Sequence, residues 1–295
     1  MIEIETQCSN ARPDTIATHL ARGGYKEAEP LFLRSLAISE KLYGKDSPSV
    51  AAALSSLGLL YKNQGNYTEA ESQYKRAMVI YEKSPIQNAQ NLATNLHNLA
   101  VLYKIQGQYT KAEPMFKQSL SIREKSLGLN NAAVSESLSS LADLYRLQKK
   151  YNQAELMAKQ SLAIAKKILG ETHPRLAASL NNLASIYIDQ GLYSQAEPLF
   201  KRSLEILERT YGPENLFVAT GLNNLAEVYK KQGDFTQSEQ LYLKAISILI
   251  KTVGGNHPFV ANSLENLAEV YFETGRQDEA KELTKRVVAI RETKL

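Results

Sequence analysis

LAASLNNLASIYIDQGLYSQAEPLF, residues 176–200, decides the fold, because close versions of this stretch recur every 42 residues along the chain. The recurrence is easiest to follow at the turn in its middle, where a glycine precedes an aromatic residue, as at Gly107 and Tyr109, Gly191 and Tyr193, and Gly233 and Phe235. A period of this length is typical of a solenoid, in which each short unit buries its apolar face against its neighbours. The sequence therefore predicts a stack of repeats with no stretch left for a separate catalytic domain.

Each repeat is predicted to form two helices. Leu180, Leu183 and Tyr187 recur at helical spacing, with the small Ala184 between the last two, so a second helix can approach closely. A glycine then ends the first helix. The second helix is predicted to open with a capping box in four repeats, formed by Thr68 and Glu71, Thr110 and Glu113, Ser194 and Glu197, and Thr236 and Glu239. His173 and His257, which precede prolines, are predicted to cap the next first helix.

Composition limits the classes of function. A formal net charge of +4 over 295 residues, spread along the predicted helices, argues against a nucleic-acid binder. The single cysteine, Cys8, allows no disulfide framework within the chain. We find no signal peptide and no run of 18 apolar residues, so the expectation is a cytoplasmic protein that does not enter a membrane.

Enzyme motifs are missing from the sequence. It contains no GxxxxGK, HExxH, CxxC or GxSxG pattern, and its four histidines fall in four different repeats. We therefore expect no enzymatic activity, no cofactor and no metal.

The pattern Leu-Ala/Gly-x-x-Tyr, Gly-x-Tyr and Ala-x-x-x-Tyr/Phe resembles the tetratricopeptide repeat, in the 42-residue form of kinesin light chains and their bacterial relatives. The resemblance implies an all-α fold, a right-handed α-solenoid superhelix of helix-turn-helix repeats. It implies a flexible segment at 1–12 and a single solenoid at 13–295. The solenoid would comprise a degenerate first unit at 13–49 and repeats at 50–91, 92–133, 134–175, 176–217, 218–259 and 260–295.

The resemblance also implies where a partner binds. In this family the first helices line a concave groove, and an asparagine before the signature leucine forms a ladder along a bound peptide. The ladder positions here are Ser56, Asn98, Ser140, Asn182, Asn224 and Asn266. The preceding register adds His97, Asn181 and Asn223 as candidate groove residues. The alternative is that these polar side chains only bridge neighbouring helices or face water.

Cations follow the ladder by six residues, at Lys62, Lys104, Arg146 and Lys230. They favour a protein or peptide ligand with acidic residues or a free carboxylate. The alternative is a solvated stripe of basic side chains.

The predicted function is a non-enzymatic protein-interaction scaffold that binds a peptide segment, extended or helical, in its concave groove. Two alternatives stay open. The repeats would be a regulatory or sensor module of a larger multidomain signalling protein, or they would form a homo-oligomer through the helices predicted at Asp14–Arg22 and Lys281–Leu295.

Overall fold

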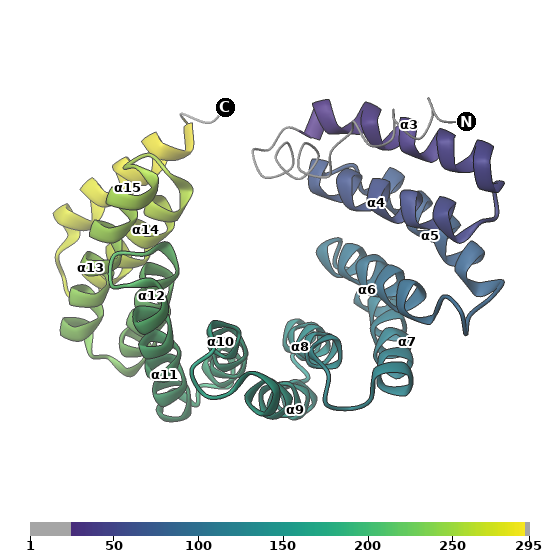
Figure 1. The fold of residues 1–295 in the computed structure, drawn as a ribbon. Helices are drawn as coiled ribbons and strands as arrows, with labels where there is room; N and C mark the ends of the chain where they lie inside the picture. Colours follow the sequence, from purple (N-terminus) through teal and green to yellow (C-terminus); the bar gives the residue numbers. More distant parts are fainter. Residues whose placement is uncertain (1–24, 293–295) are drawn as a thin grey trace. The chain divides into compact units, whose positions relative to one another are not determined.

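The computed structural model describes residues 25–292, and within this range the chain forms thirteen α-helices and no strand (Figure 1). The helices are α3 (Tyr25–Tyr43), α4 (Pro48–Gln64), α5 (Tyr67–Glu82), α6 (Ala89–Ile105), α7 (Tyr109–Leu127), α8 (Ala132–Leu147), α9 (Tyr151–Leu169), α10 (Pro174–Asp189), α11 (Tyr193–Tyr211), α12 (Leu216–Gln232), α13 (Phe235–Val253), α14 (Pro258–Glu273) and α15 (Gln277–Glu292). The predictions for segment 1–12, Cys8 and the helix Asp14–Arg22 fall outside the described residues.

The chain divides into two compact units, Met1–Leu144 and Tyr145–Leu295. In the first unit α4 packs on α5 and α6 on α7; in the second, α10 packs on α11, α12 on α13 and α14 on α15. The second helix of one pair also packs on the first helix of the next, as α5 does on α6 and α13 on α14. The all-helical fold of repeated pairs is confirmed, whereas the single superhelix over 13–295 and its hand stay predictions.

The small residue of the signature lies where the two helices of a pair come closest. Ala100 and Ala184 are fully buried. At the equivalent Gly58, an added Cβ would lie 2.8 Å from the Tyr74 ring of the paired helix. Such close packing excludes larger side chains, because protein interiors have little free volume. The predicted role of this position is confirmed.

The turn between paired helices requires a left-handed residue. Gly65, Gly191 and Gly233 have φ values of 81°, 75° and 82° there. Lys149 takes the same position in its repeat with φ 59°, and it is the only non-glycine residue in the described chain with positive φ. A residue with a Cβ adopts this conformation at a cost, because the Cβ approaches the following carbonyl oxygen.

The two predicted histidine caps are confirmed, whereas the four predicted capping boxes are not. His173 Nδ1 accepts from the Arg175 amide at 3.1 Å, and His257 Nδ1 accepts from the Phe259 amide at 3.2 Å, so both histidines are N-caps. The capping boxes are wrong, because the N-cap of each second helix lies two residues earlier and the aromatic is already the first helical residue. Thr68 and its equivalents therefore lie inside the first turn, and the cap residues of α5, α7 and α11 make no side-chain cap bond.

Glutamates at the register of these boxes instead connect consecutive pairs. In five repeats this glutamate accepts a hydrogen bond from the signature tyrosine of the next first helix, which we call the inter-repeat Tyr–Glu bond. Its members are Tyr61 to Glu29, Tyr103 to Glu71, Tyr187 to Glu155, Tyr229 to Glu197 and Tyr271 to Glu239, at 2.9–3.3 Å. Burial and the facing carboxylate raise the pKa of Tyr103 and Tyr271, so these phenols stay protonated donors.

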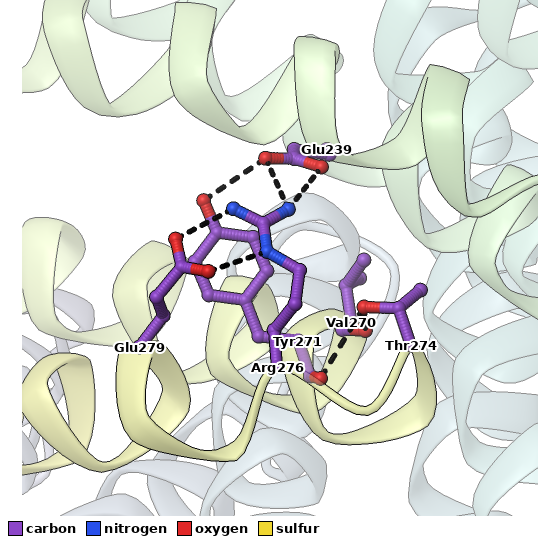
Figure 2. A network of polar contacts seen from close by, with 6 residues as sticks. All are labelled: Glu239, Val270, Tyr271, Thr274, Arg276 and Glu279. Atoms are coloured by element: carbon purple, nitrogen blue, oxygen red, sulfur yellow. Dashed lines mark hydrogen bonds and ion pairs between the residues drawn. The ribbon is translucent and has the colours of Figure 1, made fainter.

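At the pair α14–α15 this bond lies within a larger network (Figure 2). The Arg276 guanidinium stacks on the Tyr271 ring, 3.8 Å from its centroid, and donates two 2.8 Å hydrogen bonds to Glu239. The same guanidinium also binds Glu279 at 2.7 Å. Arg276 thus ties α13, α14 and α15 together through one planar cation.

Candidate interaction face of the first helices

The six ladder residues are all partly exposed on the first helices α4, α6, α8, α10, α12 and α14: Ser56, Asn98, Ser140, Asn182, Asn224 and Asn266. They differ in their internal bonds. Ser56 Oγ donates to the Ala52 carbonyl of its own helix at 3.0 Å. The amides of Asn98, Asn224 and Asn266 form no side-chain hydrogen bond within residues 25–292. Each of these three amides therefore keeps a donor and an acceptor for another molecule.

The register before the ladder lies deeper, between consecutive first helices. Ser55 Oγ donates to Asn95 Oδ1 at 2.9 Å, and Asn223 Nδ2 donates to Ser263 Oγ at 2.7 Å. These two bonds link α4 to α6 and α12 to α14. The register thus bridges neighbouring helices, the alternative left open by the sequence.

The three residues predicted at this register differ in their surroundings, and their role in a groove stays a prediction. His97 is only 8% exposed and packs edge-on against Phe116, with the ring centroids 5.3 Å apart. Asn223 is occupied by Ser263. The buried Oδ1 atoms of Asn181 and Asn223 both lack a hydrogen-bond partner among the described residues. His97 thus packs on the second helix of its own pair, whereas Asn223 bridges two first helices.

His97 also lies near a buried cation. Arg123 of α7 is 4% exposed and donates to the Ser137 hydroxyl at 2.9 Å and the Ala133 carbonyl at 3.0 Å. Burial, and then the charge of Arg123, lower the pKa of His97 to about 4. The imidazole is consequently neutral near pH 7, and its Nδ1 has no partner within the described chain.

Three of the four predicted groove cations pair with acids of the following repeat. Lys104 binds Asp143, Arg146 binds Asp189 at 2.9 Å, and Lys230 binds Glu269 at 2.7 Å. Lys230 also binds Glu227 at 2.6 Å. Burial by itself would lower the pKa of Lys230, but the hydrogen bonds to these two glutamates raise it above its ordinary value.

Lys62 is the exception. At the position equivalent to Asp143 and Glu269, the repeat that follows Lys62 has Val101 and therefore no acid. Lys62 makes no ion pair with any residue in 25–292. Burial lowers the pKa of this half-buried ammonium. Leu59, one helical turn before Lys62 on α4, is exposed, and so is Ile105 of α6, which stands at the register of Asp189, the acid bound by Arg146. The first unit thus carries an uncompensated cation beside apolar surface.

Reasoning from the sequence placed Asp143 and Glu269 beside the ladder but did not predict that they bind the cations. Asp143 and Glu269 each lie 39 residues after the cation that they bind, one period less one helical turn, and this spacing was the signal that could have revealed them. Within the described chain, no group of three or more His, Cys, Asp or Glu side chains is arranged to hold a metal ion. Among the thirteen helices, none combines the length and apolarity that crossing a lipid bilayer requires.

The helix pairs agree with a family model. The tetratricopeptide repeat model matches residues 16–83, 91–167, 159–209, 175–235 and 217–293, which cover nearly the whole chain. The chain belongs to the tetratricopeptide repeat family. Tetratricopeptide proteins are generally non-catalytic scaffolds, and this tetratricopeptide chain is a repeat scaffold suited to protein–protein interaction.

Solved structures with the same tetratricopeptide architecture include kinesin light chain-like proteins. BtubC (BKLC) from P. vanneervenii is 24% identical with a TM-score of 0.62, over 78% of this chain and 89% of that one. A putative kinesin light chain of Podosopora anserina with nearly identical TPR-like repeats is 28% identical with a TM-score of 0.60, over 70% and 97%. The apo form of RapI is 17% identical with a TM-score of 0.71, over 94% and 95%. No curated protein matches the chain significantly.

Proposed function

We propose that this tetratricopeptide chain binds a segment of a partner protein along its first helices, through the ladder amides. The observation that carries the proposal is the free hydrogen-bonding capacity of Asn98, Asn224 and Asn266 on an otherwise well-bonded scaffold. A primary amide offers one donor and one acceptor side, which matches the N–H and C=O of a peptide group. Partly exposed amides also contribute little to folding, which is consistent with a role in binding.

Within this proposal, the partner segment carries an acidic side chain or a free carboxylate that binds Lys62. An ammonium that is half-buried without an acid gains most from an anionic ligand, because burial has already removed part of its hydration and the ligand has less water to displace. Leu59 and Ile105 would contact an apolar side chain next to that carboxylate. At Lys104, Arg146 and Lys230, a ligand carboxylate would have to compete with internal acids, so these sites contribute less.

The test compares partner capture with thermal stability. We would replace Asn98, Asn224 and Asn266 together by alanine and capture partners from the native lysate, with identification by mass spectrometry. The matched control replaces Gln118, Gln195 and Gln240, exposed amides on second helices, by alanine. We expect the ladder variant to lose the captured partner with a melting temperature close to wild type, and the control to keep it.

Two results would contradict the proposal. If the ladder variant melts much earlier than the control, the amides are structural. If it retains the partner, binding occurs on another face. A Lys62→Ala variant then tests the acidic contact separately, and unchanged capture by that variant would reject the contact at Lys62 alone.

A further inference from the structure

A buried hydroxyl of the first unit has no hydrogen-bond partner. Tyr74 of α5 is fully buried, and its phenol oxygen makes no hydrogen bond within residues 25–292. Two other repeats have Phe116 and Phe200 at this position and pack a ring there without a hydroxyl. Packing therefore does not require the Tyr74 hydroxyl, and an unpaired buried hydroxyl costs free energy of folding. Its presence needs another reason.

The second unit shows what binds a phenol at this position. Tyr242 is the equivalent residue of α13, and its hydroxyl donates to Glu227 Oε2 at 2.9 Å. The same oxygen binds Lys230 Nζ at 2.6 Å. One carboxylate oxygen thus accepts hydrogen bonds from a buried phenol and an ammonium, and its negative charge strengthens both bonds.

The first unit has the same two donors without the acceptor. Tyr74 and Lys62 stand at the registers of the second-unit tyrosine and lysine, but the register of Glu227 is Leu59. A Cβ added at Gly58 would lie 3.0 Å from the Tyr74 ring carbon that bears the hydroxyl. The hydroxyl end of the ring therefore lies against α4 beside Leu59, where the second unit has its carboxylate.

A ligand reaches the phenol by displacing the Leu59 side chain. The hydroxyl itself is closed off from solvent, but Leu59 is 38% exposed and lies one helical turn after the ladder residue Ser56. Exposed side chains change rotamer within nanoseconds, so this movement does not prevent binding. Burial raises the pKa of the Tyr74 phenol, which therefore stays protonated and able to donate.

We infer that Tyr74 and Lys62 together bind one carboxylate oxygen of the partner segment, in the place that Glu227 fills in the second unit. The inference rests on the acidic contact at Lys62 that forms part of the proposed function, and it adds Tyr74 as the residue that determines specificity. Two donors that converge on one oxygen favour a carboxylate over a neutral carbonyl. The carboxylate comes from a chain terminus or from an acidic side chain, and the test separates these two sources.

Three small probes test the inference on the full chain. N-acetylleucine carries a terminal carboxylate, the α-amide of N-acetylglutamic acid carries a side-chain carboxylate, and N-acetylleucinamide is the neutral control. NMR of chain labelled with ¹³C at tyrosine Cζ and lysine Cε follows Tyr74 and Lys62, with signals assigned from Tyr74→Phe and Lys62→Ala. We expect saturable shifts of both signals with a carboxylate probe and none with the neutral control. The carboxylate probe that binds more tightly identifies the source.

Variants of the protein then test each donor. Tyr74→Phe should weaken the carboxylate probe at least about tenfold, measured at the Lys62 signal, because a hydrogen bond to a charged group is lost. Leu59→Glu supplies the carboxylate from within the chain and should abolish probe binding. Val79→Glu, the same change in charge at an exposed apolar residue of α5, is the matched control and should keep the wild-type affinity.

Three outcomes would overturn the inference: no binding of either carboxylate probe, equal binding of the charged and neutral probes, or wild-type affinity in Tyr74→Phe. In the third case, a loss of binding in Lys62→Ala would keep the proposed acidic contact and reject only the role of Tyr74. The ladder variant should bind the probes as the wild type does, because they are too short to reach from one ladder residue to the next. Failure of the ladder in partner capture therefore leaves this test readable.

Discussion

Lys62 in the first unit and Lys230 in the second occupy the same register of a first helix, but their surroundings have opposite chemistry. Lys230 is held by Glu227 and Glu269. At the same two registers around Lys62 the chain has Leu59 and Val101. The comparison teaches that the residues at two positions, those of Glu227 and Glu269, decide whether this lysine is neutralised by acids of the chain or stays unpaired.

The largest expected effect comes from removing both acids in the second unit. Replacing Glu227 by Leu and Glu269 by Val reproduces the surroundings of Lys62 around a lysine whose side chain is only 8% exposed. An uncompensated buried charge is strongly destabilising, so we expect a loss of about 3–5 kcal/mol in the free energy of unfolding. Urea denaturation followed by circular dichroism measures it.

The reciprocal variant, Leu59→Glu with Val101→Glu, is the matched control. It should raise the pKa of Lys62, which burial now lowers, and this shift can be followed by NMR of the lysine side chain. It should also weaken the binding of the proposed acidic partner segment. If both double variants leave the free energy of unfolding and the lysine pKa values unchanged, solvent screens these charges. The difference between the surroundings of Lys62 and Lys230 would then have no effect on stability.

A second prediction concerns His97, whose register holds Asn181 and Asn223 in the second unit. The pKa of His97 is lowered to about 4 in the folded state, against an ordinary 6.5, so the unfolded chain binds the proton first. Its stabilising contribution is complete above pH 6.5 and is lost as the pH falls towards 4. The loss should be on the order of 3 kcal/mol.

Hydrogen exchange localises this effect. Amides of α6 should lose protection between pH 6.5 and 4 more than amides of α12, after correction for the intrinsic exchange rate. His97→Asn, which installs the residue of the second unit, should abolish the difference. Equal acid sensitivity in the wild type and this variant would show that carboxylates, and not His97, cause the loss.

The smallest effect is expected at the turns. Lys149→Gly should stabilise the chain by about 1 kcal/mol, because glycine adopts the left-handed conformation without a Cβ conflict. Gly191→Lys should cost a similar amount, since no atom lies within 4 Å of the Cβ that it would add. Both turns belong to the second unit, so melting temperatures that move in the same direction would refute a purely backbone origin.

Much of the fold could be predicted, because its determinants recur at local spacing. The helical faces, the small residue at Ala184 and the left-handed glycines each depend on residues within one pair, and so does the cap at His173. The capping boxes failed because Thr68 and Glu71 satisfy the spacing of a box, whereas the aromatic Tyr67 already begins the helix. A pattern of residue types does not reveal which residue adopts the first helical dihedrals.

The candidate site could be predicted only in part. Asn98, Asn224 and Asn266 lie partly exposed on the first helices, as the resemblance implied, but their role in binding stays a prediction. The bonds that occupy Lys104 and Lys230 join residues of different repeats, and the depth of His97 depends on how α6 meets α7. These contacts arise from packing between elements, which periodicity within one repeat does not specify.

The inter-repeat Tyr–Glu bond has a consequence for how such chains change over evolutionary time. Wherever this bond forms between consecutive repeats, it joins a tyrosine and a glutamate at the same repeat positions. Any repeat from 50–91 to 218–259 therefore carries the residues needed to form this joint, the contact between consecutive repeats, with any other. Gene duplication or deletion in steps of 42 codons would therefore rebuild a complete joint each time. The length of the array can drift while its joints are preserved, and a new repeat is free to acquire its own ladder-facing side chains.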